Sequence, residues 1–128
     1  MPEMIVLDAS AILALLKREQ GADRVKAVLG RASICAVNVA EVQGKLIQSG
    51  LSRQAAEARI RILGCNITPF DDVQAIEAGS LITQTRSLGF SLGDRACLAL
   101  AIDRKATVYT TDKAWQNLNL GIKIEVIR

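Results

Sequence analysis

The chain has 128 residues, half of them apolar but only 3% aromatic, and carries a formal net charge of +3 without any histidine. This length suits one domain with a real core, the few aromatic rings argue against nucleobase stacking as the main mode of binding, and no segment approaches the ~20 apolar residues of a transmembrane helix. Three widely spaced cysteines without a C-x-x-C pair indicate reduced thiols, and the opening lacks the basic segment of a signal peptide, so we expect one domain over residues 1–128, in the cytoplasm and without a membrane partner.

Strand-like runs alternate along the chain with longer segments in which apolar residues recur at helical spacing. We expect strands at 4–7, 32–36, 66–69, 107–111 and 123–127. We expect helices at 10–17, 37–48, 52–63, 71–85 and 94–105. Such alternation is typical of an α/β fold, so we predict a mostly parallel sheet of about five strands flanked by α-helices.

Four acidic residues, far apart in the sequence, lie where such a fold could bring them together: Asp8, Glu41, Asp94 and Asp112. Asp8 closes the first predicted strand and Asp112 closes the fourth, and ligands of open parallel sheets bind at the carboxyl ends of strands. Carboxylates that share one pocket repel one another unless a cation compensates. Because the ligands would be oxygen atoms only, we expect Mg²⁺ or Mn²⁺ and not zinc.

Each acid also has a purely structural explanation. Asp8, Asp94 and Asp112 each lie where they could cap a helix, Asp94 as part of a capping-box pattern. Glu41 lies inside a predicted helix among small apolar residues, where its structural alternative is an ion pair with Lys45 one turn later. These explanations treat the acids one at a time, whereas one shared pocket accounts for all four.

Four sequence motifs occur in the order and spacing of a known family. They are Ile5-Val-Leu-Asp8-Ala-Ser10, Asn38-Val-Ala-Glu41-Val, Leu92-Gly-Asp94-Arg-Ala-Cys-Leu-Ala and Tyr109-Thr-Thr-Asp112-Lys-Ala-Trp115. Together they resemble PIN domains over essentially the whole chain, and most closely the VapC-type ribonuclease toxins of bacterial type II toxin–antitoxin systems. Two positions depart from the usual pattern: Ala9 replaces Thr or Ser, and Asn38 stands where Ser or Thr is frequent.

The resemblance implies an endoribonuclease that depends on Mg²⁺ or Mn²⁺. Its catalytic carboxylates would be those of Asp8, Glu41, Asp94 and Asp112. The metal would be bound by Asp8, Asp94 and Asp112 and would activate the water that hydrolyses an RNA phosphodiester. Since the chain has no histidine, paired imidazoles cannot act as acid and base, and the metal must generate the nucleophile.

Other side chains receive supporting roles from the same resemblance. Ser10 and Thr110 would orient carboxylates or water through their hydroxyl groups. Arg95 and Lys113 are the basic residues nearest in sequence to the acids, so they could bind phosphates of the substrate, or they could serve as local charge balance and as a solvated surface residue. Asp103 lies on another face of its predicted helix, and we interpret it as a surface residue.

The resemblance also implies two protein partners. A toxic nuclease would have a cognate antitoxin, and an apolar groove for a partner helix is expected between Ile12, Leu15 and Leu16 and the predicted helix at 52–63. The same apolar residues could instead face the sheet or a second copy of the chain. A homodimer is expected as well, at an interface that the sequence does not locate.

Two other functions compete with the nuclease. A phosphorelay receiver is also a small α/β domain with an acidic Mg²⁺ pocket, and the pair Asp71-Asp72 after the third predicted strand suits it. Asp8, however, lacks the acidic neighbour that a receiver needs at that turn. The second competitor is a catalytically silent PIN-like module that only binds RNA or protein, although all four carboxylates are present.

Overall fold

The computed structural model describes residues 3–128, and residues 1 and 2 of the predicted domain lie outside this part. Within it, five parallel strands form one sheet in the order β3-β2-β1-β4-β5. The strands are β1 (Ile5–Leu7), β2 (Ala32–Cys35), β3 (Asn66–Thr68), β4 (Thr107–Thr110) and β5 (Ile124–Val126). The predicted α/β fold with about five strands is therefore confirmed, and the sheet is entirely parallel.

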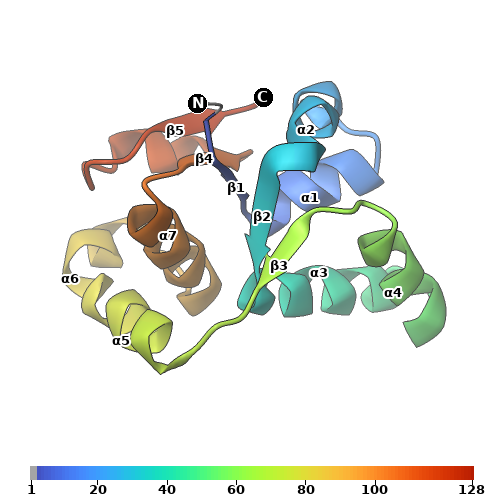
Figure 1. The fold of residues 1–128 in the computed structure, drawn as a ribbon, viewed down its shortest axis with the longest axis horizontal. Coiled ribbons are helices and arrows are strands. Elements are labelled where there is room, and N and C mark those ends of the chain that lie inside the picture. Colours follow the sequence, from blue (N-terminus) through green and yellow to red (C-terminus); the bar gives the residue numbers. More distant parts are fainter. Residues whose placement is uncertain (1–2) are drawn as a thin grey trace.

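Helices cover both faces of this sheet (Figure 1). One layer contains α1 (Ala9–Leu16), α2 (Ala22–Val28), α3 (Ala36–Gln48) and α4 (Arg53–Arg61). The other contains α5 (Asp72–Ser80), α6 (Ile82–Thr85) and α7 (Leu92–Arg104). Short 3-10 helices, η1 (Leu29–Arg31), η2 (Arg86–Leu88) and η3 (Lys113–Asn117), complete the connections.

Two helix predictions differ from the structure. Helix α2 was not expected, because it begins after Gly21, which has a φ of +97° and offers no side-chain cap that a sequence pattern could reveal. The single helix expected at 71–85 is divided into α5 and α6 after Ser80. The hydroxyl of Ser80 donates to the carbonyl of Ile76 at 2.7 Å, a bond that competes with regular helix continuation.

The central strand β1 divides the core into two halves. Ile5 and Leu7 point into a cluster with α1, α2, α3 and α4, whereas Val6 points into a cluster with α5 and α7. This follows from the alternation of side chains along a strand. Helix α7 has buried residues on most of its surface, as its apolar sequence predicts, and its first turn lies near the carboxyl ends of the strands.

The strand order argues against a phosphorelay receiver, one of the two competing functions. Here β1 is central, with β2 and β4 as its neighbours, whereas receiver domains have the strand order 2-1-3-4-5. In addition, Asp71 caps α5, and its Oδ1 accepts a hydrogen bond of 2.9 Å from the amide of Gln74. The receiver interpretation is therefore wrong. Within residues 3–128, no helix combines the length and the apolar character that crossing a membrane requires.

Candidate active site

Asp8 links the end of β1 to the start of α1. Its Oδ1 accepts hydrogen bonds from the amide of Ala11 at 2.8 Å and from the hydroxyl of Ser10 at 2.6 Å, and only 5% of the residue is exposed. The predicted capping role is thus present. A cap of this kind leaves Oδ2 free for a second interaction, so capping and a role in a shared pocket are compatible.

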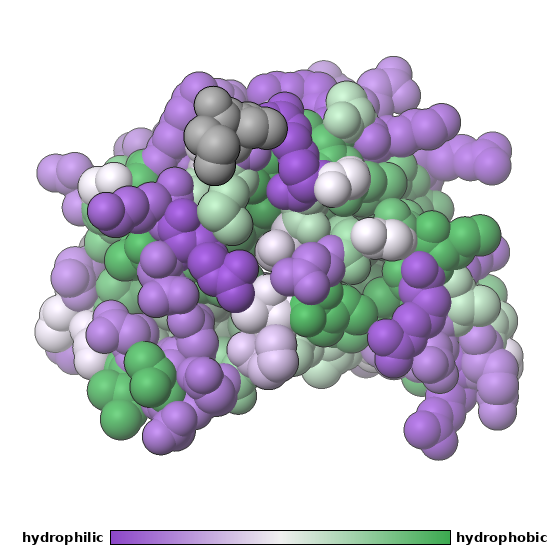
Figure 2. Space-filling view, viewed as in Figure 1, coloured by the Kyte–Doolittle hydropathy of each residue, from purple (hydrophilic) through white to green (hydrophobic). Residues whose placement is uncertain are grey.

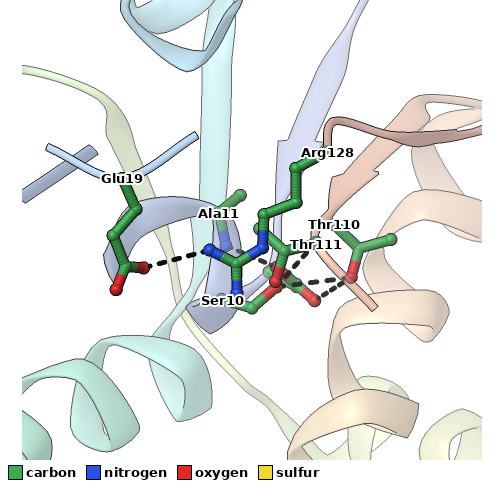
Figure 3. Close-up of polar contacts among 7 residues, drawn as sticks. Ser10, Ala11, Glu19, Thr110, Thr111 and Arg128 are labelled. Atoms are coloured by element: carbon green, nitrogen blue, oxygen red, sulfur yellow. Dashed lines mark hydrogen bonds and ion pairs between the residues drawn. The ribbon is translucent and has the colours of Figure 1, made fainter. Parts of the chain in front are cut away.

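The second oxygen of Asp8 is held from the neighbouring strand. Thr110, which is fully buried at the end of β4, donates its hydroxyl to Oδ2 over 2.6 Å. Ser10 accepts a 2.9 Å hydrogen bond from the amide of Thr111, and Thr110 accepts one of 3.1 Å from the amide of Asp112. Figure 3 shows Ser10 and Thr110 pointing toward one another from the two elements. The two hydroxyls named from the sequence therefore fix the Asp8 carboxylate.

The electrostatic environment of Asp8 disfavours its charge. Burial raises the pKa of this carboxyl to about 6, although the hydrogen bonds from Ser10, Thr110 and Ala11 lower it, and the negative charge of Asp94 raises it further. Among residues 3–128, no lysine or arginine forms an ion pair with Asp8. A buried carboxylate without a basic partner is a suitable ligand for a cation.

Asp94 lies in the first turn of α7. Its amide donates to the hydroxyl of Ser91 at 3.2 Å, while its Oδ2 accepts from the amide of Ser91 at 3.0 Å, which is the capping box that the sequence indicated. The residue is half-buried. As with Asp8, the helix cap brings a carboxylate to the end of a helix that packs on the sheet.

Glu41 is positioned by its own helix. Its Oε1 accepts a 2.7 Å hydrogen bond from the side-chain amide of Asn38, three residues earlier on α3. No ion pair joins Glu41 to Lys45 within the described residues, so this structural alternative is wrong. The Glu41 carboxylate lies against Gly93 on α7, so close that a Cβ at that position would overlap it.

The charges of three of the four predicted acids act on one buried thiol. Burial raises the pKa of Cys97, on α7, well above its usual value, and the negative charges of Asp8, Asp94 and Glu41 raise it further. These carboxylates come from three different elements of the fold. Asp112 lies in a different setting: it is exposed and caps η3, where its Oδ1 accepts a 2.9 Å hydrogen bond from the amide of Ala114.

The donor set suits a hard divalent cation, because it consists of carboxylate oxygens without a basic partner. Within residues 3–128, no three acidic side chains are gathered closely enough to hold a metal ion as they stand. Asp94 and Glu41 instead hold protein donors, Ser91 and Asn38. The Nδ2 of Asn38 is engaged with Glu41, whereas its buried Oδ1 has no hydrogen-bond partner.

The two basic candidates are arranged differently from one another. Arg95 reaches away along α7, and its Nη1 donates to the carbonyl of Ala78 on α5 at 3.1 Å. Lys113 is exposed at the start of η3. Asp103 is exposed near the other end of α7, 3.7 Å from Arg104, as a surface residue would be.

The sequence model of the PIN domain family matches residues 5–119 of this chain. The chain belongs to the PIN domain family. Among curated proteins, none matches it. The predicted PIN fold is thus confirmed over most of the chain.

Several solved structures share this PIN fold at low sequence identity. VapBC2 from Rickettsia felis, bound to a DNA fragment from its promoter, aligns with a TM-score of 0.74 and 16% identity, covering 95% of this chain and 97% of that one. DNA-bound VapBC from Salmonella typhimurium aligns with a TM-score of 0.73 and 18% identity, covering 97% and 98%. VapBC-5 from Mycobacterium tuberculosis aligns with a TM-score of 0.65 and 23% identity, covering 99% of both chains. At these identities the likeness shows the fold alone.

Sequence reasoning missed the residues that hold Glu41. Asn38 was noted only as a departure from the usual Ser or Thr, and Gly93 only as part of a motif. The spacing of Asn38 and Glu41 on one helix could have indicated their contact, since residues three apart lie on the same face. Gly93 lies 55 positions after Asn38 in the sequence. Its contact with Asn38 follows only from the packing of α3 against α7.

Proposed function

We propose that this PIN domain is a VapC-like toxin, an endoribonuclease that requires Mg²⁺ or Mn²⁺ and is inhibited by a cognate antitoxin. The observation that carries the proposal is the buried Asp8 carboxylate, which Ser10 and Thr110 hold at the end of β1 and which has no basic partner among residues 3–128. Membership of the PIN family supports a nuclease, and the similar folds of VapBC proteins support a toxin. Such a protein would act on RNA in the cytoplasm.

The acids have distinct roles in this proposal. Asp8 and Asp94 would bind the cation, with Asp112 as a further ligand from the end of β4, and Glu41 would complete the catalytic carboxylates. A divalent cation at this position would supply water of lowered pKa and would stabilise negative charge on the phosphate. Ser10 and Thr110 keep the Asp8 carboxylate in one orientation, so no side-chain reorganisation is needed there during the reaction.

Charge supports an RNA substrate. The net charge of +3 favours a polyanionic partner such as RNA. We propose that Lys113, which is exposed next to Asp112, contacts a flanking phosphate. Arg95 donates to a carbonyl of α5, so we assign it to the packing of that helix before any contact with substrate.

The groove expected for an antitoxin has a counterpart on the surface. A depression of about 1200 Å³ runs between α1, α2 and the end of α4, with an apolar floor and a charged rim. Leu15, Leu16 and Leu63 are half-buried in its lining and Ile62 is an exposed part of it, whereas Ile12 is buried in the core and takes no part. An amphipathic helix with acidic and basic residues at its margins suits such a groove. We propose that the antitoxin binds here.

A homodimer remains part of the proposal. Figure 2 shows hydrophilic side chains around the rim of the molecule and separate apolar patches, one of them over α5. The exposed apolar residues of that region are Val73 and Ile76 on α5, with Leu92 at the start of α7. Because exposed apolar side chains at helical spacing favour burial against a partner, this region suits the dimer contact.

The decisive experiment compares RNA cleavage by the wild type with cleavage by Asp8→Asn and Asp94→Asn in Mg²⁺. Each substitution preserves the size of the side chain and a hydrogen-bond acceptor, so circular dichroism should report an unchanged fold. We expect cleavage to fall at least about a hundredfold in both variants and to persist in Asp103→Asn. Undiminished cleavage by Asp8→Asn would contradict the mechanism, and a wild type that binds RNA without cleaving it would favour the silent PIN-like module.

A further inference from the structure

We propose that Asn38 and Gly93 form a clamp that positions the carboxylate of Glu41 within the acidic site. The inference rests on the proposed nuclease function, and it assigns both residues as positioning residues. Asn38 acts by hydrogen bonding and Gly93 by leaving space. Neither residue carries a charge, so the clamp leaves the negative charge of Glu41 intact.

Asn38 uses the nitrogen of its side-chain amide to join two helices. The residue is 1% exposed and lies in the first turn of α3. Its Nδ2 donates to Oε1 of Glu41 at 2.7 Å and to the carbonyl of Gly93, on α7, at 3.0 Å. Because both partners are acceptors, only the nitrogen of the amide can face them, and the orientation of the side chain is fixed.

The identity of residue 38 matters because two hydrogen-bond donors are needed at one atom, one for the Glu41 carboxylate and one for the Gly93 carbonyl. An asparagine amide supplies two donors, whereas a serine or threonine hydroxyl supplies one. A hydroxyl at this position could bind either the Glu41 carboxylate or the Gly93 carbonyl, so the link between α3 and α7 would be lost on one side. An arginine or lysine could reach both, but its positive charge would compete with a cation for Glu41.

Gly93 is a glycine for reasons of space. Its φ is not among the positive values that favour glycine, so backbone conformation does not require it. A Cβ built on Gly93 would instead overlap the carboxylate of Glu41. Glycine is less favourable than alanine in a helix. Glycine is nevertheless present at position 93, where the Glu41 carboxylate approaches the backbone of α7.

The clamp predicts an unusual combination of effects for Gly93→Ala. The added methyl group favours α7, and it meets only the far end of a flexible side chain, so the protein should fold with an equal or higher melting temperature. The same methyl group displaces the Glu41 carboxylate from its place. We therefore expect a drop of about 10–100-fold in Mn²⁺ affinity and in kcat for RNA, with KM little changed.

Three measurements test the clamp in the full chain. The probe for the site is Mn²⁺ alone, titrated by electron paramagnetic resonance. NMR signals of the Asn38 side-chain amide report the position of Glu41, and RNA cleavage gives kcat and KM. Gly44→Ala is the matched control, because Gly44 is a helical glycine on α3 and nothing lies near its added Cβ. Asn38→Ser is the complementary variant, and we expect it to lower Mn²⁺ affinity in the same way.

The possible results either support the clamp or overturn it. Altered Asn38 amide signals in Gly93→Ala, together with weaker Mn²⁺ binding and unchanged behaviour of Gly44→Ala, support the clamp. Unaltered amide signals, or altered signals with wild-type Mn²⁺ affinity, overturn it. A wild type that binds Mn²⁺ but cleaves no RNA would contradict the proposed nuclease and leave the clamp standing, because the Mn²⁺ titration does not depend on RNA.

Discussion

Thr110 donates its hydroxyl proton to Asp8 across 2.6 Å, and so ties the end of β4 to the end of β1. The same hydroxyl oxygen accepts the amide of Asp112 at 3.1 Å. One buried side chain therefore fixes the Asp8 carboxylate and the turn that carries a second acid. The geometry of the site depends on this contact as much as on the acids themselves.

Replacing Thr110 by valine should destabilise the fold as well as the site. Valine keeps the shape of threonine but removes the hydrogen bonds to Oδ2 of Asp8 and to the amide of Asp112. We expect the free energy of unfolding to fall by about 1–3 kcal/mol, measured by urea denaturation. Thr110→Ser keeps the hydroxyl and serves as the control. Equal stability of the valine variant and the wild type would show that the two hydrogen bonds contribute little.

The raised pKa of Asp8 makes the stability of the metal-free protein depend on pH. A carboxyl whose pKa rises from 3.8 to about 6 on folding contributes stability that is fully present below pH 3.8 and is lost as the pH rises through about 6. The loss should reach about 3 kcal/mol near neutral pH. Urea unfolding in the presence of EDTA from pH 4 to 7.5 would measure it. Asp8→Asn lacks the titrating group, so its profile should be flatter, and parallel profiles would contradict the prediction.

A divalent cation should stabilise the wild type through the same carboxylates. A ligand that binds only the folded state adds about 1.4 kcal/mol of stability at ten times its Kd. We therefore expect the melting temperature to rise with Mg²⁺ or Mn²⁺ and to be unaffected in Asp94→Asn. EDTA should abolish RNA cleavage, and excess Mg²⁺ should restore it. Cleavage at full rate in EDTA would exclude a metal-dependent reaction.

The groove between α1, α2 and α4 predicts a variant that escapes the antitoxin. Ile62 is 84% exposed at the end of α4 and lines the groove, so Ile62→Asp should leave the fold intact while placing a charge in the apolar lining. We expect affinity for the cognate antitoxin to drop by at least about 30-fold, measured by calorimetry, with RNA cleavage unchanged. Ile47→Asp on α3, outside the groove, is the control. Similar loss in both variants would place the antitoxin elsewhere.

The sequence was most informative where local patterns decide the structure. All five strands lie within two residues of their predicted limits, because short runs of Val, Ile and Thr bounded by polar turns indicate buried strands. Asp8 and Asp94 were recognised both as caps and as site acids. The structure shows that the two explanations do not exclude one another, since a helix cap is also a way to deliver a carboxylate to the edge of a sheet.

The remaining features depend on packing between distant segments. The contact between Asn38 and Gly93 requires α3 to cross the first turn of α7, and nothing in either segment specifies the angle. The start of α2 at Gly21 depends on a left-handed backbone that many glycines never adopt. Arg95 illustrates the same limit, because its position beside Asp94 in the sequence suggested a role with phosphates, whereas its guanidinium contacts α5.

The central strand has a consequence for the synthesis of this protein. Asp8 is translated early, but its partner Thr110 follows 102 residues later. A growing chain that already contains Asp8, Glu41 and Asp94 still lacks Thr110, which supplies one of the two hydroxyls that orient Asp8. The network around Asp8 can close only once β4 has emerged. The order of synthesis therefore makes the surroundings of Asp8 one of the last parts of the fold to be completed.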